Sequence, residues 1–181
     1  MIYRSVIAAV VRALAAETMS GCGGQDFEPN VQAAKQKGAI VGKEEAFLTD
    51  CWVFGRLHKG LSAAHWRALV AKYSIHEERK HAAIRELIEA IRSPSPRQFR
   101  HCAVVTWAIP KPQGVEGKRS AGALKPTDYD MDNWCDDPAP IKTQERWRRD
   151  IRKTLEREVD DALTEAQMIL DNEGLLFAMV S

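Results

Sequence analysis

Apolar residues recur along most of this chain at the three- and four-residue spacing that places side chains on one face of a helix. Residues 2–19 are rich in Ala, Val, Ile and Leu, and residues 43–58 can place Phe, Leu, Cys and Trp side chains on one side. Residues 143–172 carry the longest such stripe, and Gly174 follows its end. The pattern therefore predicts a mainly α-helical protein with a long C-terminal helix.

Residues 61–92 predict two shorter helices joined by the turn sequence YSIH. Ser62 is a suitable N-cap for the first helix, and the sequence SPSP ends the second. The apolar positions with helical spacing are Trp66, Leu69, Val70 and Tyr73 in the first helix, and Ile84, Leu87, Ile88 and Ile91 in the second. Two helices joined by about four residues are typical of a helix-turn-helix.

The segment that follows, residues 99–109, has a β-branched centre and fits either a strand or a short buried helix. Residues 110–142 show little periodicity and many loop-forming residues. We therefore expect a small helical bundle that contains a helix-turn-helix, a long irregular loop and at most one or two short strands. Its parts would be an N-terminal helix and loop (1–42), a helical core (43–109), the charged loop (110–142) and a C-terminal helix packed on the core (143–181).

Charge is distributed in blocks, although the whole chain has a formal net charge of only +1. Residues 92–125 contain seven Lys or Arg and one acid, whereas residues 126–141 contain five Asp and no base. Residues 142–158 contain seven bases and four acids, and residues 159–173 contain five acids and no base. The near-zero net charge therefore hides strongly cationic and anionic segments.

The predicted C-terminal helix carries its charges in an order that opposes the helix dipole, which favours acids at the N-terminus and bases at the C-terminus. Here the bases come first, with Arg146, Arg149, Lys153 and Arg157 along one face, and the acids come last. A solvated face with pairs four residues apart is one interpretation. Because helix stability alone would not favour this order, a surface that binds an anion or a partner is the other. We interpret Trp147 as a core anchor at the head of the apolar stripe.

Motifs for catalysis and metal binding are incomplete in this sequence. The Gly-Lys in residues 110–126 lacks the first glycine and the Ser or Thr of a phosphate-binding P-loop. The sequence DYDMDNWCDD lacks the glycine and the glutamate of a calcium loop. The four cysteines and five histidines are dispersed without zinc-finger spacing, which leaves open only a zinc site built from distant ligands. We expect no enzyme activity and no cofactor.

The N-terminal segment ends in MSGC, which resembles a bacterial lipoprotein cleavage box at Cys22. The apolar run before it is short and is interrupted by Arg12, so a buried amphipathic helix is the preferred interpretation. No stretch of the sequence is long and apolar enough to span a bilayer. The four cysteines are dispersed and too few for the disulfide framework of a small secreted protein, so we interpret them as reduced thiols. These features together predict a cytoplasmic protein.

Three stretches of the sequence together resemble a known family. The stretch LSAAHWRALVAKYS with the basic helix after it, then WAIP, then RWRRDIRKTLEREVDDALTEAQMIL are similar to small phage and prophage proteins of the late-gene antitermination type, such as lambdoid Q and AlpA-type regulators. The resemblance covers residues 45–175. It implies a protein that binds DNA near a promoter, engages RNA polymerase paused with its sigma factor, and makes the enzyme read through terminators. Nascent RNA stays open as a further partner.

This resemblance assigns roles to two groups of basic residues. The candidates for DNA contact, in residues 61–92, are His65, Arg67, Lys72, Arg79, Lys80 and Arg85. The candidates for contact with polymerase or RNA are Lys118, Arg119, Arg146, Arg148, Arg149, Arg152 and Lys153. Two alternatives remain: a prophage-type repressor or activator that binds DNA without antitermination, and a helical protein-interaction module that binds no nucleic acid.

Overall fold

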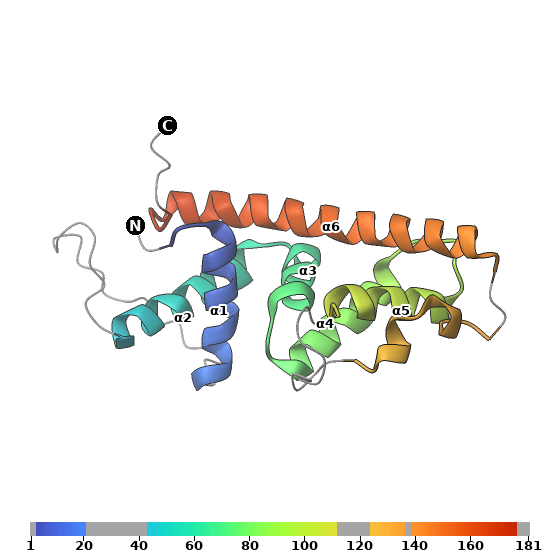
Figure 1. Cartoon of the computed structure of the whole chain (residues 1–181). Helices are drawn as coiled ribbons and strands as arrows, with labels where there is room; N and C mark the ends of the chain where they lie inside the picture. Colours follow the sequence, from blue (N-terminus) through green and yellow to red (C-terminus); the bar gives the residue numbers. More distant parts are fainter. Residues whose placement is uncertain (1–2, 21–42, 112–123, 137–138, 177–181) are drawn as a thin grey trace.

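The computed structural model describes residues 3–20, 43–111, 124–136 and 139–176, and these are mainly helical, as the apolar pattern predicts (Figure 1). The α-helices are α1 (Val6–Ser20), α2 (Lys43–Gly60), α3 (Ala63–Tyr73), α4 (Glu77–Ala90), α5 (Arg97–Ala108) and α6 (Ile141–Asn172), with two short 3-10 helices, η1 (Pro126–Tyr129) and η2 (Met131–Asn133), before α6. Within the described residues, the only β-pairing is an isolated bridge between Tyr3 and Leu176.

Helix α6 extends along one edge of the molecule, and the other helices lie on one side of it (Figure 1). Helices α1, α2, α3 and α5 all contact α6, whereas α4 packs between α3 and α5. The buried apolar residues of α6 recur every three or four positions: Ile151, Leu155, Val159, Ala162, Ala166 and Leu170. Because this apolar stripe faces the other helices, α6 organises the core and leaves its opposite side in solvent.

The two helices predicted for residues 61–92 are present as α3 and α4, joined by the turn Ser74, Ile75 and His76. Ser62 is the N-cap of α3, and its hydroxyl accepts a hydrogen bond from the His65 backbone N–H at 3.2 Å. The apolar faces of the two helices meet in the core. This arrangement keeps the short connection that is typical of a helix-turn-helix.

Residues 99–109, which fitted either a strand or a helix, belong to α5. The buried residues of α5 are Phe99, Ala103, Val104, Trp107 and Ala108. Their recurrence every three or four positions places them on one side of a helix, whereas a strand would distribute them over both faces. The described part of the charged loop also has regular structure, in η1 and η2, and Trp134 directly after them is 1% exposed. Residues 112–123 of that loop, with the candidates Lys118 and Arg119, lie outside the described residues.

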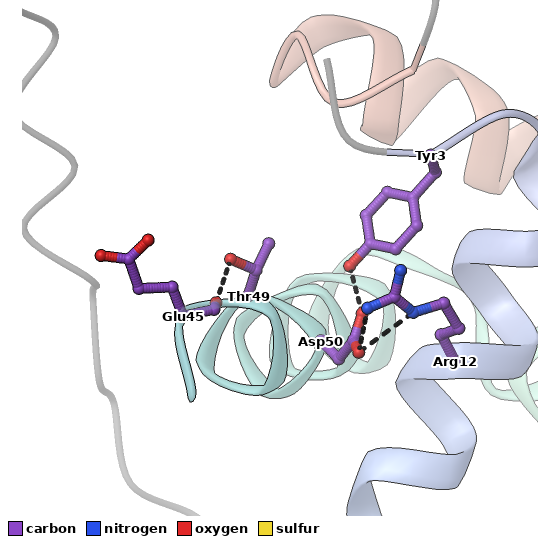
Figure 2. A network of polar contacts seen from close by, with 5 residues as sticks. All are labelled: Tyr3, Arg12, Glu45, Thr49 and Asp50. Carbon is purple, nitrogen blue, oxygen red and sulfur yellow. Dashed lines mark hydrogen bonds and ion pairs between the residues drawn. The ribbon is translucent and has the colours of Figure 1, made fainter. Parts of the chain in front are cut away.

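The N-terminal helix is held to α2 by a buried carboxylate, as Figure 2 shows. The Asp50 carboxylate accepts a hydrogen bond from the Tyr3 hydroxyl at 2.6 Å and two from the Arg12 guanidinium, at 3.2 and 2.9 Å. Tyr3 also donates its backbone N–H to the Leu175 carbonyl at 3.1 Å. Burial, followed by the hydrogen bond to Asp50, raises the pKa of Tyr3 far above its usual value, so the phenol stays neutral. These bonds fix the position of α1 against α2 and the end of α6.

Candidate nucleic-acid interface

At least four of the six residues proposed for DNA contact have hydrogen-bond or ion-pair partners inside the protein. His65 lies 2.5 Å from a carboxylate oxygen of Glu165 on α6, and Arg67 lies 3.3 Å from Glu86 on α4. Lys80 donates to the backbone carbonyls of Ser74 and Lys72, at 3.3 and 3.5 Å, and so caps the end of α3. These contacts hold α3 to its two neighbours.

Lys72, the fourth of these residues, is part of a three-helix polar contact. Its ammonium donates to Glu156 on α6 at 2.8 Å and lies 4.6 Å from the centroid of the Trp107 ring on α5. The Trp107 indole N–H donates to the same Glu156 oxygen at 2.9 Å. Burial opposes ionisation of Glu156, but the hydrogen bonds from Lys72 and Trp107 outweigh it, so the pKa of Glu156 is lowered. Lys72 is thus used to join helices.

The remaining two candidates, Arg79 and Arg85, are exposed on α4. The Arg79 guanidinium lies 5.9 Å from the Phe54 ring centroid. The other exposed charges of α4 are acidic, because Glu77, Glu78, Glu86 and Glu89 all face solvent. In a helix-turn-helix the N-terminal residues of the second helix contact base edges, and here those residues are glutamates. The exposed surface of α4 is therefore poorly suited to DNA, because the phosphates carry the same negative charge as these glutamates.

The basic half of α6, residues 142–157, offers a more strongly cationic surface. Arg146, Arg149, Lys153 and Arg157 are all exposed, at positions i, i+3, i+7 and i+11 of the helix, on the side opposite the buried stripe. Arg149 is 3.7 Å from the neighbouring Asp150, and the structure shows no other ion pair of these four side chains with a described residue. These bases are consequently available to a ligand.

The two other basic candidates on α6 are partly engaged. The Arg148 guanidinium lies 5.7 Å from the centroid of the Trp134 ring, and Arg152 lies 3.8 Å from Glu156. Both side chains are exposed and flank the line of four bases. The structure thus brings together five of the seven residues proposed for polymerase or RNA contact, all of them on α6.

An aromatic cluster anchors this half of α6. The Trp147 ring lies 5.5 Å from that of Phe99 on α5, and Phe99 lies 5.0 Å from Trp134, both edge to face. Trp147 is half-buried against the core, as its interpretation as a core anchor requires. Sequence reasoning missed Trp134, because it lies in an acidic stretch without apolar periodicity. The only sign of its burial in the sequence was a large aromatic residue within an otherwise polar loop.

The acidic residues before α6 serve local structure. Asp128 accepts a hydrogen bond from the Lys125 backbone N–H at 2.9 Å, and Asp130 accepts one from the Asp132 backbone N–H at 3.2 Å. Within the described ranges, no cluster of three or more His, Cys, Asp or Glu side chains could hold a metal ion. Burial, followed by the nearby Cys135, raises the pKa of the Cys102 thiol, which reduces its reactivity.

Comparison of the chain with protein-family models, with curated proteins and with solved structures finds no match. Of the helices in the part of the chain that the structure describes, none combines the length and the apolar character needed to cross a membrane. The candidate interface therefore rests on the geometry of α6 and on the residues around it.

Proposed function

We propose that this protein is a transcription regulator that binds the phosphate backbone of nucleic acid with the basic half of α6. One observation carries the proposal: four exposed bases, Arg146 to Arg157, share one side of a helix and have almost no acidic partners there. They extend over about 17 Å of helix axis. Such a row can neutralise several neighbouring phosphates, which is the main source of affinity in nucleic-acid binding.

The composition of this surface favours backbone contact over base stacking. Single-strand binders stack bases on exposed aromatic rings, and the row of four bases includes none. Trp147, the nearest aromatic residue, is directed into the cluster with Phe99. Contacts to phosphates position a protein without reading sequence. Double-stranded DNA is thus the preferred ligand, and base-specific contacts would come from another part of the protein.

The finer proposal is an antitermination factor that acts in the cytoplasm on RNA polymerase paused with its sigma factor. Its support is the resemblance of residues 45–175 to late-gene antitermination proteins. In this proposal the exposed bases of α6 bind duplex DNA, and the mostly acidic face of α4 is free to contact a protein. This reverses the roles that the sequence suggested for the two regions, because four of the six α3–α4 candidates have internal partners.

Binding is tested by fluorescence anisotropy with a labelled DNA duplex and a single strand of the same length at low salt. We expect the duplex to bind, and the variant Arg149→Glu with Lys153→Glu to bind at least tenfold more weakly. The matched control is Arg85→Glu with Arg92→Glu, which reverses two exposed bases elsewhere. No binding by the wild type would leave the helical protein-interaction module as the better account.

Antitermination is tested by transcription with purified RNA polymerase on a template that carries its own promoter region and a terminator. We expect the wild type to increase read-through and Arg149→Glu to reduce that increase. DNA binding without any read-through would favour a repressor or activator over an antitermination factor.

A further inference from the structure

The solvent side of α6 forms one continuous stripe, which we call the α6 stripe. It consists of Arg146, Arg149, Lys153, Arg157, Asp160, Thr164, Gln167 and Asp171, and all eight residues are exposed. Successive members are three or four residues apart. This is the spacing along which two helices can lie side by side at a small crossing angle. The α6 stripe therefore has the geometry of a helix-pairing surface.

The charges of the α6 stripe are complementary about its centre, which lies between Arg157 and Asp160. When two copies of the helix run antiparallel, Arg146 of each copy lies opposite Asp171 of the other, and Arg157 lies opposite Asp160. A two-fold axis makes each of these pairs occur twice. A parallel arrangement would instead place like charges opposite one another. The stripe is thus complementary to a second, antiparallel copy of itself.

The charged groups of these pairs are available in the single chain. The four charged residues are Arg146, Arg157, Asp160 and Asp171, and none of them forms an ion pair with another described residue. Two acids beside the stripe do form ion pairs: Glu165 pairs with His65, and Glu173 pairs with Arg56. The two acids of these pairs, Asp160 and Asp171, are therefore exposed and open to the bases of a second copy.

We propose that the protein self-associates as an antiparallel two-fold dimer through the α6 stripe, with the basic half of each α6 against the acidic half of the other. Exposed ion pairs contribute little individually and are screened by salt, so the dimer is weak and forms best at low ionic strength. The proposal does not rest on the proposed function, because dimerisation needs no nucleic acid. Since the dimer covers the basic half, a second copy and nucleic acid compete for the same bases.

The test is sedimentation equilibrium of the full chain, under reducing conditions, at about 50 mM and about 500 mM salt. We expect a monomer–dimer equilibrium at low salt and at least tenfold weaker association at high salt. Two charge-reversed variants should each be monomeric: Arg146→Glu with Arg157→Glu, and Asp160→Lys with Asp171→Lys. Mixed together, they should restore dimers, because the reversed charges are again opposite.

The control variant Arg85→Glu with Arg92→Glu should associate like the wild type. Restored dimers in the mixture also show that both variants are folded. A wild type that is monomeric at low salt, or a mixture that stays monomeric, overturns the proposal. A wild type that forms the dimer but binds no DNA would contradict only the proposed function. A wild type that binds DNA but stays monomeric at low salt would contradict only the dimer.

Discussion

At the scale of single residues, Glu156 joins three helices through one carboxylate oxygen. It accepts hydrogen bonds from Lys72 on α3 and Trp107 on α5, at 2.8 and 2.9 Å, while Arg152 lies one turn away. Both partners bind the ionised form of the carboxylate, and together they outweigh its partial burial. The contact is therefore a source of stability that depends on pH.

The replacement Glu156→Gln tests this contact. Since the pKa of Glu156 is lowered in the folded protein, its carboxylate stabilises the fold above the unfolded-state pKa of about 4.3, and this stabilisation is lost as pH falls through the folded pKa. We expect the variant to lose about 1 kcal/mol at neutral pH. Thermal unfolding followed by circular dichroism should show that the difference in stability between the wild type and the variant disappears below about pH 4. A stability difference that stays constant down to about pH 3 would show that the ionised Glu156 carboxylate is not its cause.

Asp50 is a second residue on which stability depends. Asp50→Ala should lower the free energy of unfolding by about 2 kcal/mol, because the buried Tyr3 hydroxyl and Arg12 then lose a shared acceptor. Tyr3→Phe removes one donor and leaves the Arg12 contact, so it should cost about 1 kcal/mol. Urea denaturation measures both values. An Asp50→Ala variant as stable as Tyr3→Phe would show that the Arg12 contact contributes nothing.

At the scale of helices, α6 ends at a position that requires glycine. Gly174 has φ +66°, and the next residue, Leu175, donates its N–H to the Leu170 carbonyl at 3.0 Å. Gly174→Ala should therefore destabilise the protein by about 1 kcal/mol. Gly55→Ala is the matched control within α2, since its added methyl group meets no atom within 4 Å, and it should stabilise by up to about 1 kcal/mol. Denaturant titrations in which both replacements shift stability in the same direction would disagree with these roles.

The apolar spacing of the sequence predicted some of these helices and left others undecided. The apolar spacing predicted α3, α4 and α6, because the large apolar residues that each helix packs against the core recur every three or four positions. It left α5 undecided, since a short run with adjacent valines, Val104 and Val105, suits a strand as well. It could not place Trp134, whose burial depends on Phe99, far away in the sequence.

The sequence predicted the exposed bases of α6 but not the internal partners of the α3 candidates. The exposed bases of α6 follow from its helical periodicity, which turns Arg149 and Lys153 away from the buried stripe. The internal roles of His65 and Lys72 do not follow from local sequence, because their acidic partners are 100 and 84 residues away. Long-range ion pairs leave no signal in the periodicity of either helix.

At the scale of the whole molecule, α6 has two sides with separate roles. One side carries the apolar stripe against which α1, α2, α3 and α5 pack, and the other carries the α6 stripe. The acidic half of this helix and the segment before it balance the bases, so the net charge of +1 conceals a cationic surface. Low net charge limits nonspecific attraction to nucleic acid at long range, while local contact with phosphates remains strong.

If the basic half of α6 binds phosphates, duplex DNA binding must weaken steeply as the salt concentration rises. The slope of log K against log salt should be about −3 to −4 if four phosphates are neutralised. Arg149→Glu with Lys153→Glu should reduce its magnitude by about 2, while Arg85→Glu with Arg92→Glu leaves it unchanged. A wild-type slope near zero, or a larger change in the Arg85→Glu with Arg92→Glu control than in the α6 variant, would show that these bases do not bind phosphates.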